Sequence, residues 1–219
     1  MPGDPQPRPA AADVALPAAT RYVVATFNRH KAAELHALLA LPGVALVPLA
    51  DWPGATAPEE HGSTLLENAR IKARAAAALT GLPAIADDTG LEVDALGGAP
   101  GVHAARYAGP DATYAENVAK LLRELTGVPT ARRTARFRTV CVAAWPEGRE
   151  LSAEGLLEGV ITETARGTNG FGYDPVFVPA GDTRTYAELT DEEKNAMSHR
   201  ARAVKGLGER LASHPNGTP

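Results

Sequence analysis

The chain has 219 residues, of which 44% are hydrophobic and 22% charged, and its formal net charge is -4. This is the balance of an ordinary globular protein, and the length suits one large domain or two closely joined lobes. The negative net charge excludes a whole-molecule field that would hold nucleic acid by its backbone. It leaves room for a local basic pocket that binds a small anion.

The cellular compartment is indicated by what the sequence lacks. A single cysteine, Cys141, excludes an internal disulfide framework, and its place between two valines is typical of a buried apolar residue. No stretch approaches the roughly 20 apolar residues of a membrane span, and the N-terminus lacks a signal-peptide pattern. We expect a cytoplasmic protein without membrane contact, with flexible tails at 1–20 and 213–219 around one domain at 21–212.

The first half of the chain predicts alternating strands and helices. Strands are expected over 22–26 and 44–49, with a helix over 31–41 that begins after the natural N-cap Asn28. Thr64 and Glu67 have the spacing of a capping box and open an alanine-rich helix that stops at Gly81. A short buried strand over 84–86 then ends in two acids.

The second half begins with a Gly- and Pro-rich segment over 94–110, and a loop of that length is usually functional. Capping boxes at Thr113 and Thr190 open two further helical stretches, the second running to about residue 212. Between them, strands over 136–145 and 149–157 form a predicted hairpin, and a glycine-rich loop over 167–175 precedes a strand over 176–178. The pattern indicates an α/β protein with a mixed sheet.

The segment from Thr26 to Lys31 is a candidate phosphate site. A strand gives way there to polar side chains and a helix start, where free N–H groups and the positive end of the helix dipole suit an anion. Lys31 in the first turn opposes that dipole unless an anion offsets it. The chain has no Gly-x-x-x-x-Gly-Lys-Ser/Thr at this place, which disfavours a P-loop protein.

Two adjacent acids, Asp87 and Asp88, are a candidate metal site. They follow an apolar strand, where ligands bind in open α/β sheets, although an acidic turn is an equally good interpretation of the pair alone. A hard cation held by carboxylates and substrate phosphates would relieve their repulsion. Glu59 or Glu60 would add an oxygen ligand, and Lys72, on the same helix face as Asn68, would join the site only if that face turns toward Lys31.

The last candidates would bind a flat ligand. Glycines on both sides of Phe171 permit close backbone approach and leave its ring exposed, although such loops also form plain structural turns. On one continuous helix, His199 and Arg200 would lie about 140° and 240° around from Lys194. We therefore predict a break near Ser198, which would cap a new helix and aim both residues back at the pocket. A solvated basic helix is the alternative.

Together these segments resemble the inosine/xanthosine triphosphate pyrophosphatase family, the Ham1/RdgB-like enzymes, over nearly the whole chain outside its tails. The resemblance is carried by residues in the family's order: Thr26, Asn28, Lys31 and Glu34; Glu67-Asn68-Ala69 with Lys72-Ala73; Ala86 to Leu91; Gly98 to Val102; Ala105-Arg106-Tyr107; Gly170 to Pro175; Ala187-Glu188, Lys194 and Ser198-His199-Arg200. It implies an elongated mixed β-sheet flanked by helices, with the active-site cleft between two lobes, and a homodimer.

The resemblance also implies roles for particular residues. Asp88 would be the catalytic base and a Mg²⁺ ligand, and Glu59 the other metal ligand. The triphosphate would lie among Thr26, Asn28, Lys31 and Lys72. Phe171 would stack on the purine base, in a pocket completed by the remaining substrate-binding residues: Thr89, Gly172, Tyr173, Asp174, Lys194, Ser198, His199 and Arg200.

The implied reaction removes pyrophosphate from purine nucleoside triphosphates such as ITP, dITP and XTP. Donors aimed at a 6-keto oxygen would be left unpaired by the amino group of adenine, which costs several kcal/mol. That rule does not explain rejection of GTP, which rests on the resemblance alone. The chain departs from the family pattern at Thr89, Ala104 and Phe27, which bears on substrate preference.

Two other functions fit the same residues. A related pyrophosphatase of the Maf type would act on modified pyrimidine or guanine nucleotides without preferring hypoxanthine. A nucleotide-binding sensor would keep the pocket and hydrolyse nothing. The joint presence of Asp88, both lysines and the His199-Arg200 pair argues against lost catalysis.

Overall fold

The structure, a computed structural model, describes residues 20–39 and 44–213. Apart from their inner ends, the predicted tails at 1–20 and 213–219 lie outside these residues, as does the predicted end of the first helix at 40–41. The strands are β1 (Thr20–Val24), β2 (Val44–Pro48), β3 (Ala84–Val93), β4 (Pro100–Gly101), β5 (Thr134–Ala144), β6 (Glu150–Ile161) and β7 (Phe177–Pro179). The helices are α1 (Arg29–Leu38), α2 (Leu65–Thr80), α3 (Tyr114–Glu124), α4 (Asp191–Met197) and α5 (His199–Ser213).

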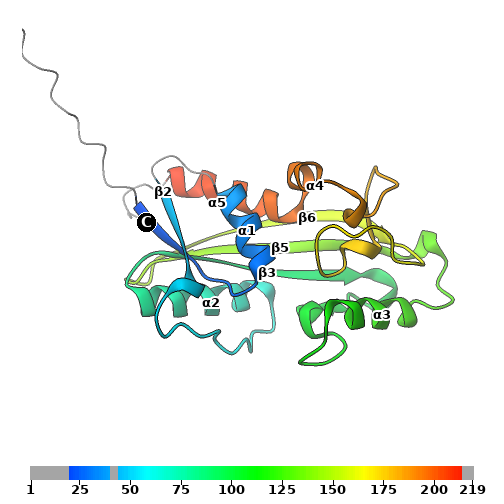
Figure 1. Ribbon diagram of the computed structural model, residues 1–219, viewed down its shortest axis with the longest axis horizontal. Helices are drawn as coiled ribbons and strands as arrows, with labels where there is room; N and C mark the ends of the chain where they lie inside the picture. Colours follow the sequence, from blue (N-terminus) through cyan, green and yellow to red (C-terminus); the bar gives the residue numbers. More distant parts are fainter. Residues whose placement is uncertain (1–19, 40–43, 214–219) are drawn as a thin grey trace, which may run out of the picture.

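Within the described residues the strands form one mixed sheet in the order β2-β1-β3-β5-β6-β7, and β4 pairs with β3. β1 is parallel to β2 and β3, whereas β5, β6 and β7 are antiparallel to their neighbours. The long strands run along the length of an elongated molecule, with α2 on one side and α5 on the other (Figure 1). The predicted α/β class, mixed sheet and hairpin are confirmed.

β3 differs from its prediction in length. It runs from Ala84 to Val93 without interruption, so Asp87 and Asp88 lie within the strand and not after its end. The physical reason is β5, which pairs with β3 at every position from Ala84 to Val93 and holds even the acidic residues in the ladder. The predicted loop over 94–110 is likewise more ordered than expected, since it contains β4 and two short 3₁₀ turns.

The opposite edge of β3 explains where a cavity can form. β1 pairs only with Ala84 and Ile85, and β4 only with Leu91 and Glu92. Among the described residues no strand covers the edge between these pairings. Side chains from both faces of the sheet therefore reach the same space around 86–90.

The predicted helix signals are confirmed. Thr64, Thr113 and Thr190 each form a capping box with the glutamate three residues later, and Gly81 ends α2 in the left-handed conformation at φ 66°. The predicted break also occurs, because Ser198 has an extended backbone and its hydroxyl accepts a hydrogen bond from the Ala201 N–H. This break separates α4 from α5.

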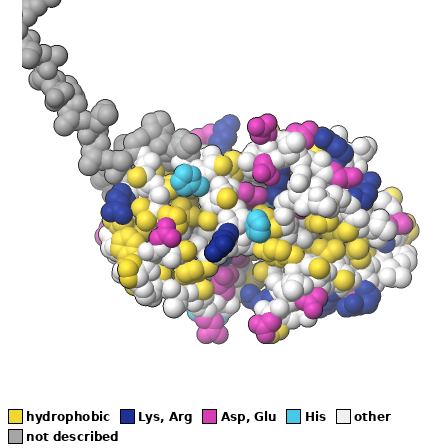
Figure 2. Space-filling view, viewed as in Figure 1, with side chains coloured by type: hydrophobic (Ala, Val, Ile, Leu, Met, Phe, Trp, Pro, Cys, Tyr) yellow, Lys and Arg dark blue, Asp and Glu magenta, His cyan; other side chains and the backbone are white. Residues whose placement is uncertain are grey.

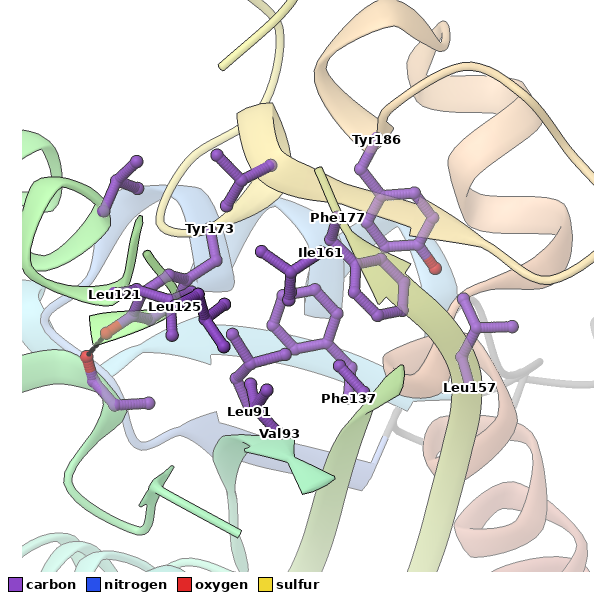
Figure 3. Packing of buried hydrophobic residues seen from close by; sticks show 14 of the residues in the cluster. Leu91, Val93, Leu121, Leu125, Phe137, Leu157, Ile161, Tyr173, Phe177 and Tyr186 are labelled. Atoms are coloured by element: carbon purple, nitrogen blue, oxygen red, sulfur yellow. Dashed lines mark hydrogen bonds between the residues drawn. The ribbon is translucent and has the colours of Figure 1, made fainter. Parts of the chain in front are cut away.

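Within residues 20–39 and 44–213 the core has three parts that fix the helices to the sheet. Alanines of α2 pack on one face of β1, β3 and β5, while Leu35 of α1 and Leu207 of α5 pack on the other face. α5 approaches β6 closely at Gly155, where an added Cβ would collide with the backbone of His199. A third cluster joins α3 to Phe137, Tyr173 and Phe177 at the other end of the long strands (Figure 3). In the described parts of the chain, no helix has the length and apolar character that crossing a membrane requires.

Candidate active site

A cavity of about 330 Å³ opens beside the uncovered edge of β3, a volume within the usual range for small-molecule sites. One part of its lining comes from the start of α1, the Lys72 side of α2, the loop before α2 and β3 itself. Another part comes from the loop at 171–174, Lys194 of α4 and the start of α5. Near the middle of the face in Figure 2, basic, acidic and histidine side chains lie between two areas of hydrophobic side chains.

The cavity brings together the predicted phosphate-binding residues. Thr26, Asn28, Lys31 and Lys72 all line it. Asn28 caps α1 as predicted, since its side-chain oxygen accepts hydrogen bonds from the His30 and Lys31 N–H groups. The Asn28 side-chain amide donates to the Tyr114 hydroxyl over 2.9 Å, which links the start of α1 to the start of α3.

Asp88 and Lys72 form the best-defined acid–base pair of the cavity. Asp88 is mostly buried on β3, and its carboxylate accepts a 2.8 Å hydrogen bond from Lys72 Nζ. Lys72 Nζ also lies 3.3 Å from Glu60. Burial alone would lower the pKa of Lys72, but Asp88, Asp87 and Glu60 raise it above its ordinary value, so the lysine is charged.

Glu60, and not Glu59, provides the second carboxylate of this group. Glu60 lines the cavity, whereas Glu59 is exposed and is not among the lining residues. From the residues alone both acids were candidates, and only the resemblance indicated Glu59. The structure separates them because only Glu60 reaches Lys72.

Asp87 faces a different set of cations. Its fully buried carboxylate accepts hydrogen bonds from Arg200 at 3.1 and 3.2 Å and lies 3.4 Å from Lys31 Nζ. Burial alone would raise the pKa of Asp87, but Lys31, Arg200 and Lys72 together lower it far below the ordinary range. Asp87 is therefore a permanent anion that holds Arg200 in place.

Glu34 and Asp174 extend this ion-pair network across the cavity. Glu34 binds Lys194 through one carboxylate oxygen at 2.9 Å and Arg200 through the other. Lys194 Nζ also donates to Asp174 over 2.7 Å. Burial of Asp174 raises the pKa of its carboxyl, although Lys194 opposes the shift. The predicted base-reading cations are therefore fixed by acids on three different elements.

His199 is buried beneath Arg200 and lines the cavity. Its Nδ1 lies 2.7 Å from the Thr139 hydroxyl, and its ring packs 4.7 Å from the ring of Phe137. Burial, together with Arg200 and Lys194, lowers the pKa of His199 well below its ordinary value. The imidazole is therefore neutral at pH 7 and presents one donor and one acceptor nitrogen.

The loop from Gly170 to Asp174 is held by its own acid. The Phe171 N–H donates to Asp174, and Gly170 has φ 74°, a conformation that favours glycine. Tyr173 is buried in the third core cluster and donates its hydroxyl proton to the Ala104 carbonyl (Figure 3). Phe171, Gly172, Tyr173 and Asp174 all line the cavity, as Thr89 does.

Two predicted residues have mainly structural contacts, and several others were missed. Ser198 caps α5 and is not among the lining residues, and Thr89 donates to Asp87 and lies 2.7 Å from the Thr139 hydroxyl. Glu34 was part of the resemblance, and its position three residues after Lys31 on one helix face was the available signal. The remaining missed residues, His30, Tyr114 and Thr139, carry no signal in the sequence.

A sequence profile of the Ham1 family matches residues 22–210, which is most of the chain. The chain belongs to the Ham1 family. This membership confirms the resemblance that the motifs indicated. The matched residues include all those that line the cavity.

Members of the Ham1 family with similar sequences and structures agree with this assignment. A dITP/XTP pyrophosphatase of Geobacillus kaustophilus is 52% identical over 187 residues, covering 85% of this chain and 92% of the relative. The structure of a HAM1 protein from Coxiella burnetii has a TM-score of 0.80 at 43% identity, covering 89% and 99% of the two chains. The Staphylococcus aureus Ham1 protein has a TM-score of 0.79 at 35% identity, covering 89% and 100%.

Proposed function

We propose that this protein hydrolyses non-canonical purine nucleoside triphosphates, such as ITP, dITP and XTP, to the monophosphate and pyrophosphate. One observation carries the proposal: a single cavity is lined both by Asp88, Glu60 and Lys72 and by Phe171, Lys194 and His199. The first group suits a metal and phosphates, and the second suits an aromatic base. The names of the family's dITP/XTP pyrophosphatases support the same reaction.

The carboxylates of the first group, Asp88 and Glu60, fit Mg²⁺. Mg²⁺ is commonly held by one or two protein carboxylates together with substrate phosphates and water. Asp88 and Glu60 match this number of ligands, because both lie within 3.3 Å of Lys72 Nζ and are therefore close to each other. The described residues contain no group of three acidic, histidine or cysteine ligands. We therefore assign the second metal ligand to Glu60, in place of Glu59. When bound, the ion would neutralise phosphate charge and lower the pKa of a nearby water.

Asp88 takes the proton in this mechanism. A water attacks the α-phosphorus, Asp88 accepts its proton, and the bond from the α-phosphorus to the bridging oxygen breaks. Pyrophosphate leaves with the electron pair of that bond. Lys31 and Lys72 stabilise the charge that develops on it, and Thr26 and Asn28 orient the phosphates at the start of α1.

Base selection belongs to the second group of residues. Phe171 stacks on the purine, Lys194 and Arg200 provide donors, and His199 provides Nε2, the ring nitrogen that Thr139 does not engage. A 6-keto purine satisfies these donors, whereas the amino group of adenine leaves them unpaired. Ser198 contributes by capping α5, which fixes His199 and Arg200, and Thr89, Tyr173 and Asp174 hold the walls.

A substrate panel tests this function. The protein is incubated with Mg²⁺ and ITP, dITP, XTP, GTP, ATP or dTTP, and turnover of each is measured. We expect ITP, dITP and XTP to be preferred over ATP by at least about ten-fold, the effect of roughly 1.4 kcal/mol. Equal rates on ITP and ATP would reject the base selection. Turnover of dTTP above ITP would favour the Maf-type alternative, and binding without turnover would favour a sensor.

We also propose that the protein acts as a cytoplasmic homodimer. The proposal rests on the family resemblance. Light scattering should give twice the chain mass of 22.8 kDa. A mass of one chain at micromolar concentration would contradict the dimer.

A further inference from the structure

Among the described residues, the ring of Phe171 has four close neighbours: Tyr114, Lys194 and Arg200, which line the cavity, and His30, which contacts Phe171 without being a lining residue. The His30 ring stacks on it with centroids 5.2 Å apart and planes 18° apart. The Tyr114 ring lies 5.9 Å away at 43°. Lys194 Nζ and the Arg200 guanidinium lie 5.0 and 5.8 Å from the ring centroid. A base that stacks on Phe171 must therefore displace one of these groups.

Two of the four neighbours are immobile. Lys194 and Arg200 are buried and bound to acids, so moving either cation would leave buried charges unpaired. Breaking a buried ion pair in this way is strongly unfavourable. The cations therefore stay where they are when a ligand enters.

The other two neighbours, His30 and Tyr114, have exposed side chains that can move. His30 is exposed in the first turn of α1, and Tyr114 is 40% exposed at the first position of α3. Tyr114 is tied at its hydroxyl to Asn28 by one hydrogen bond. Both residues lie in the first turns of helices and neither belongs to a core cluster, so their rings can move without disturbing the core.

The dimensions favour a sandwich over simple displacement. A base between two aromatic rings needs about 7 Å between them, that is, two contacts of about 3.5 Å. The His30 and Phe171 centroids are 5.2 Å apart, so His30 needs to move outward by only about 2 Å. A rotation of one exposed side chain covers that distance.

We propose that His30 and Tyr114 are substrate-positioning residues that clamp the purine base against Phe171. In the free protein their rings cover Phe171 and keep its face from water, and on binding they move apart and stack on the base. This inference rests on the proposed function. Because every purine has a π-face, the clamp strengthens binding of all purine nucleotides equally and leaves base selection to Lys194, His199 and Arg200.

Kinetics of His30 and Tyr114 variants test the clamp. We expect His30→Ala and Tyr114→Ala to raise KM for ITP and for XTP by the same factor, between about five-fold and about a hundred-fold, with kcat within about two-fold of wild type. His30→Phe keeps the ring and should restore KM to within about three-fold, whereas Tyr114→Phe also removes the hydroxyl that accepts from the Asn28 amide. His36→Ala removes an exposed histidine at the other end of α1 and is the matched control.

Binding of IMP, measured by calorimetry, separates this proposal from the proposed function. The alanine variants should bind IMP more weakly than wild type by the same factor as their KM rises. Unchanged IMP binding and KM in both alanine variants would overturn the clamp while leaving the hydrolase intact. A rise in KM for His30→Ala that His30→Phe does not reverse would also overturn it. If wild type neither hydrolyses ITP nor binds IMP, both proposals fail.

Discussion

Asp87 and Asp88 are adjacent on β3, yet their carboxylates bind cations from different helices. Asp88 accepts a hydrogen bond from Lys72 of α2, and Asp87 binds Arg200 of α5. Alternation along the strand turns the two side chains to opposite faces of the sheet. The uncovered edge of β3 lets the Asp88 side and the Arg200 side reach one cavity. One acid is thus available for chemistry, and the other is committed to structure.

Asp88→Asn is expected to reduce hydrolysis of ITP by about 10²- to 10⁴-fold, because it removes the carboxylate proposed to accept the proton. The amide has the same size and still accepts a hydrogen bond from Lys72. The thermal midpoint should therefore change by only a few degrees. Steady-state kinetics and circular dichroism melting measure the two effects, and retention of most activity would show that another group is the base.

Asp87→Asn is expected to destabilise the fold, whereas Asp88→Asn is expected mainly to reduce activity. It removes the buried anion that Lys31 faces and that Arg200 binds beside Glu34, and removing one partner of such a pair costs about 3–5 kcal/mol of folding free energy. Urea unfolding measures this loss. A variant as stable as wild type would contradict the structural role assigned to Asp87.

Glu60→Gln is expected to raise the Mg²⁺ concentration required for half-maximal activity, because it removes one of the two carboxylates proposed to hold the ion. Glu59→Gln is the matched control, since it neutralises the neighbouring acid outside the cavity. Activity is titrated with Mg²⁺ at fixed ITP for both variants. If Glu59→Gln shifts the titration and Glu60→Gln does not, the assignment of the second ligand reverts to Glu59.

The buried neutral His199 predicts a pH-dependent stability. Its pKa is lowered in the folded state, so the unfolded chain binds a proton first as the pH falls. Stability from this residue is fully present above about pH 6.5 and is lost below it, at up to about 1.4 kcal/mol per pH unit. Asp87 contributes no slope there, since its lowered pKa matters only below its ordinary value near 4.

Urea unfolding of wild type and His199→Gln at pH 7.5, 6.5, 5.5 and 5.0 isolates this effect. The wild-type free energy of unfolding should fall more steeply than that of the variant between pH 6.5 and 5.0. Parallel curves over this range would mean that His199 is not held neutral in the folded state.

Local signals explain which parts of the fold could be predicted. Capping boxes, Gly81 and the angular argument around Ser198 depend on residues within a few positions of one another, and each agreed with the structure. The length of β3 did not, because Asp87 and Asp88 stay in the strand only through pairing with β5, some fifty residues later. Tertiary pairing overrode the local turn chemistry of the two acids.

The candidate site shows the same division. Motif order brought Thr26, Lys31, Lys72, Asp88 and Phe171 into one predicted pocket, and the structure places them there. The choice between Glu59 and Glu60 depended on which side chain reaches Lys72, and the neighbours of Phe171 depended on where α1 and α3 begin in space. Sequence spacing contains neither relationship.

Isotope labelling shows which phosphorus the water attacks. Hydrolysis of ITP is carried out in H₂¹⁸O with Mg²⁺, and the products are separated and analysed by mass spectrometry. Attack at the α-phosphorus predicts one ¹⁸O in IMP and unlabelled pyrophosphate. Label in pyrophosphate, or release of orthophosphate and IDP, would contradict the mechanism assigned to Asp88.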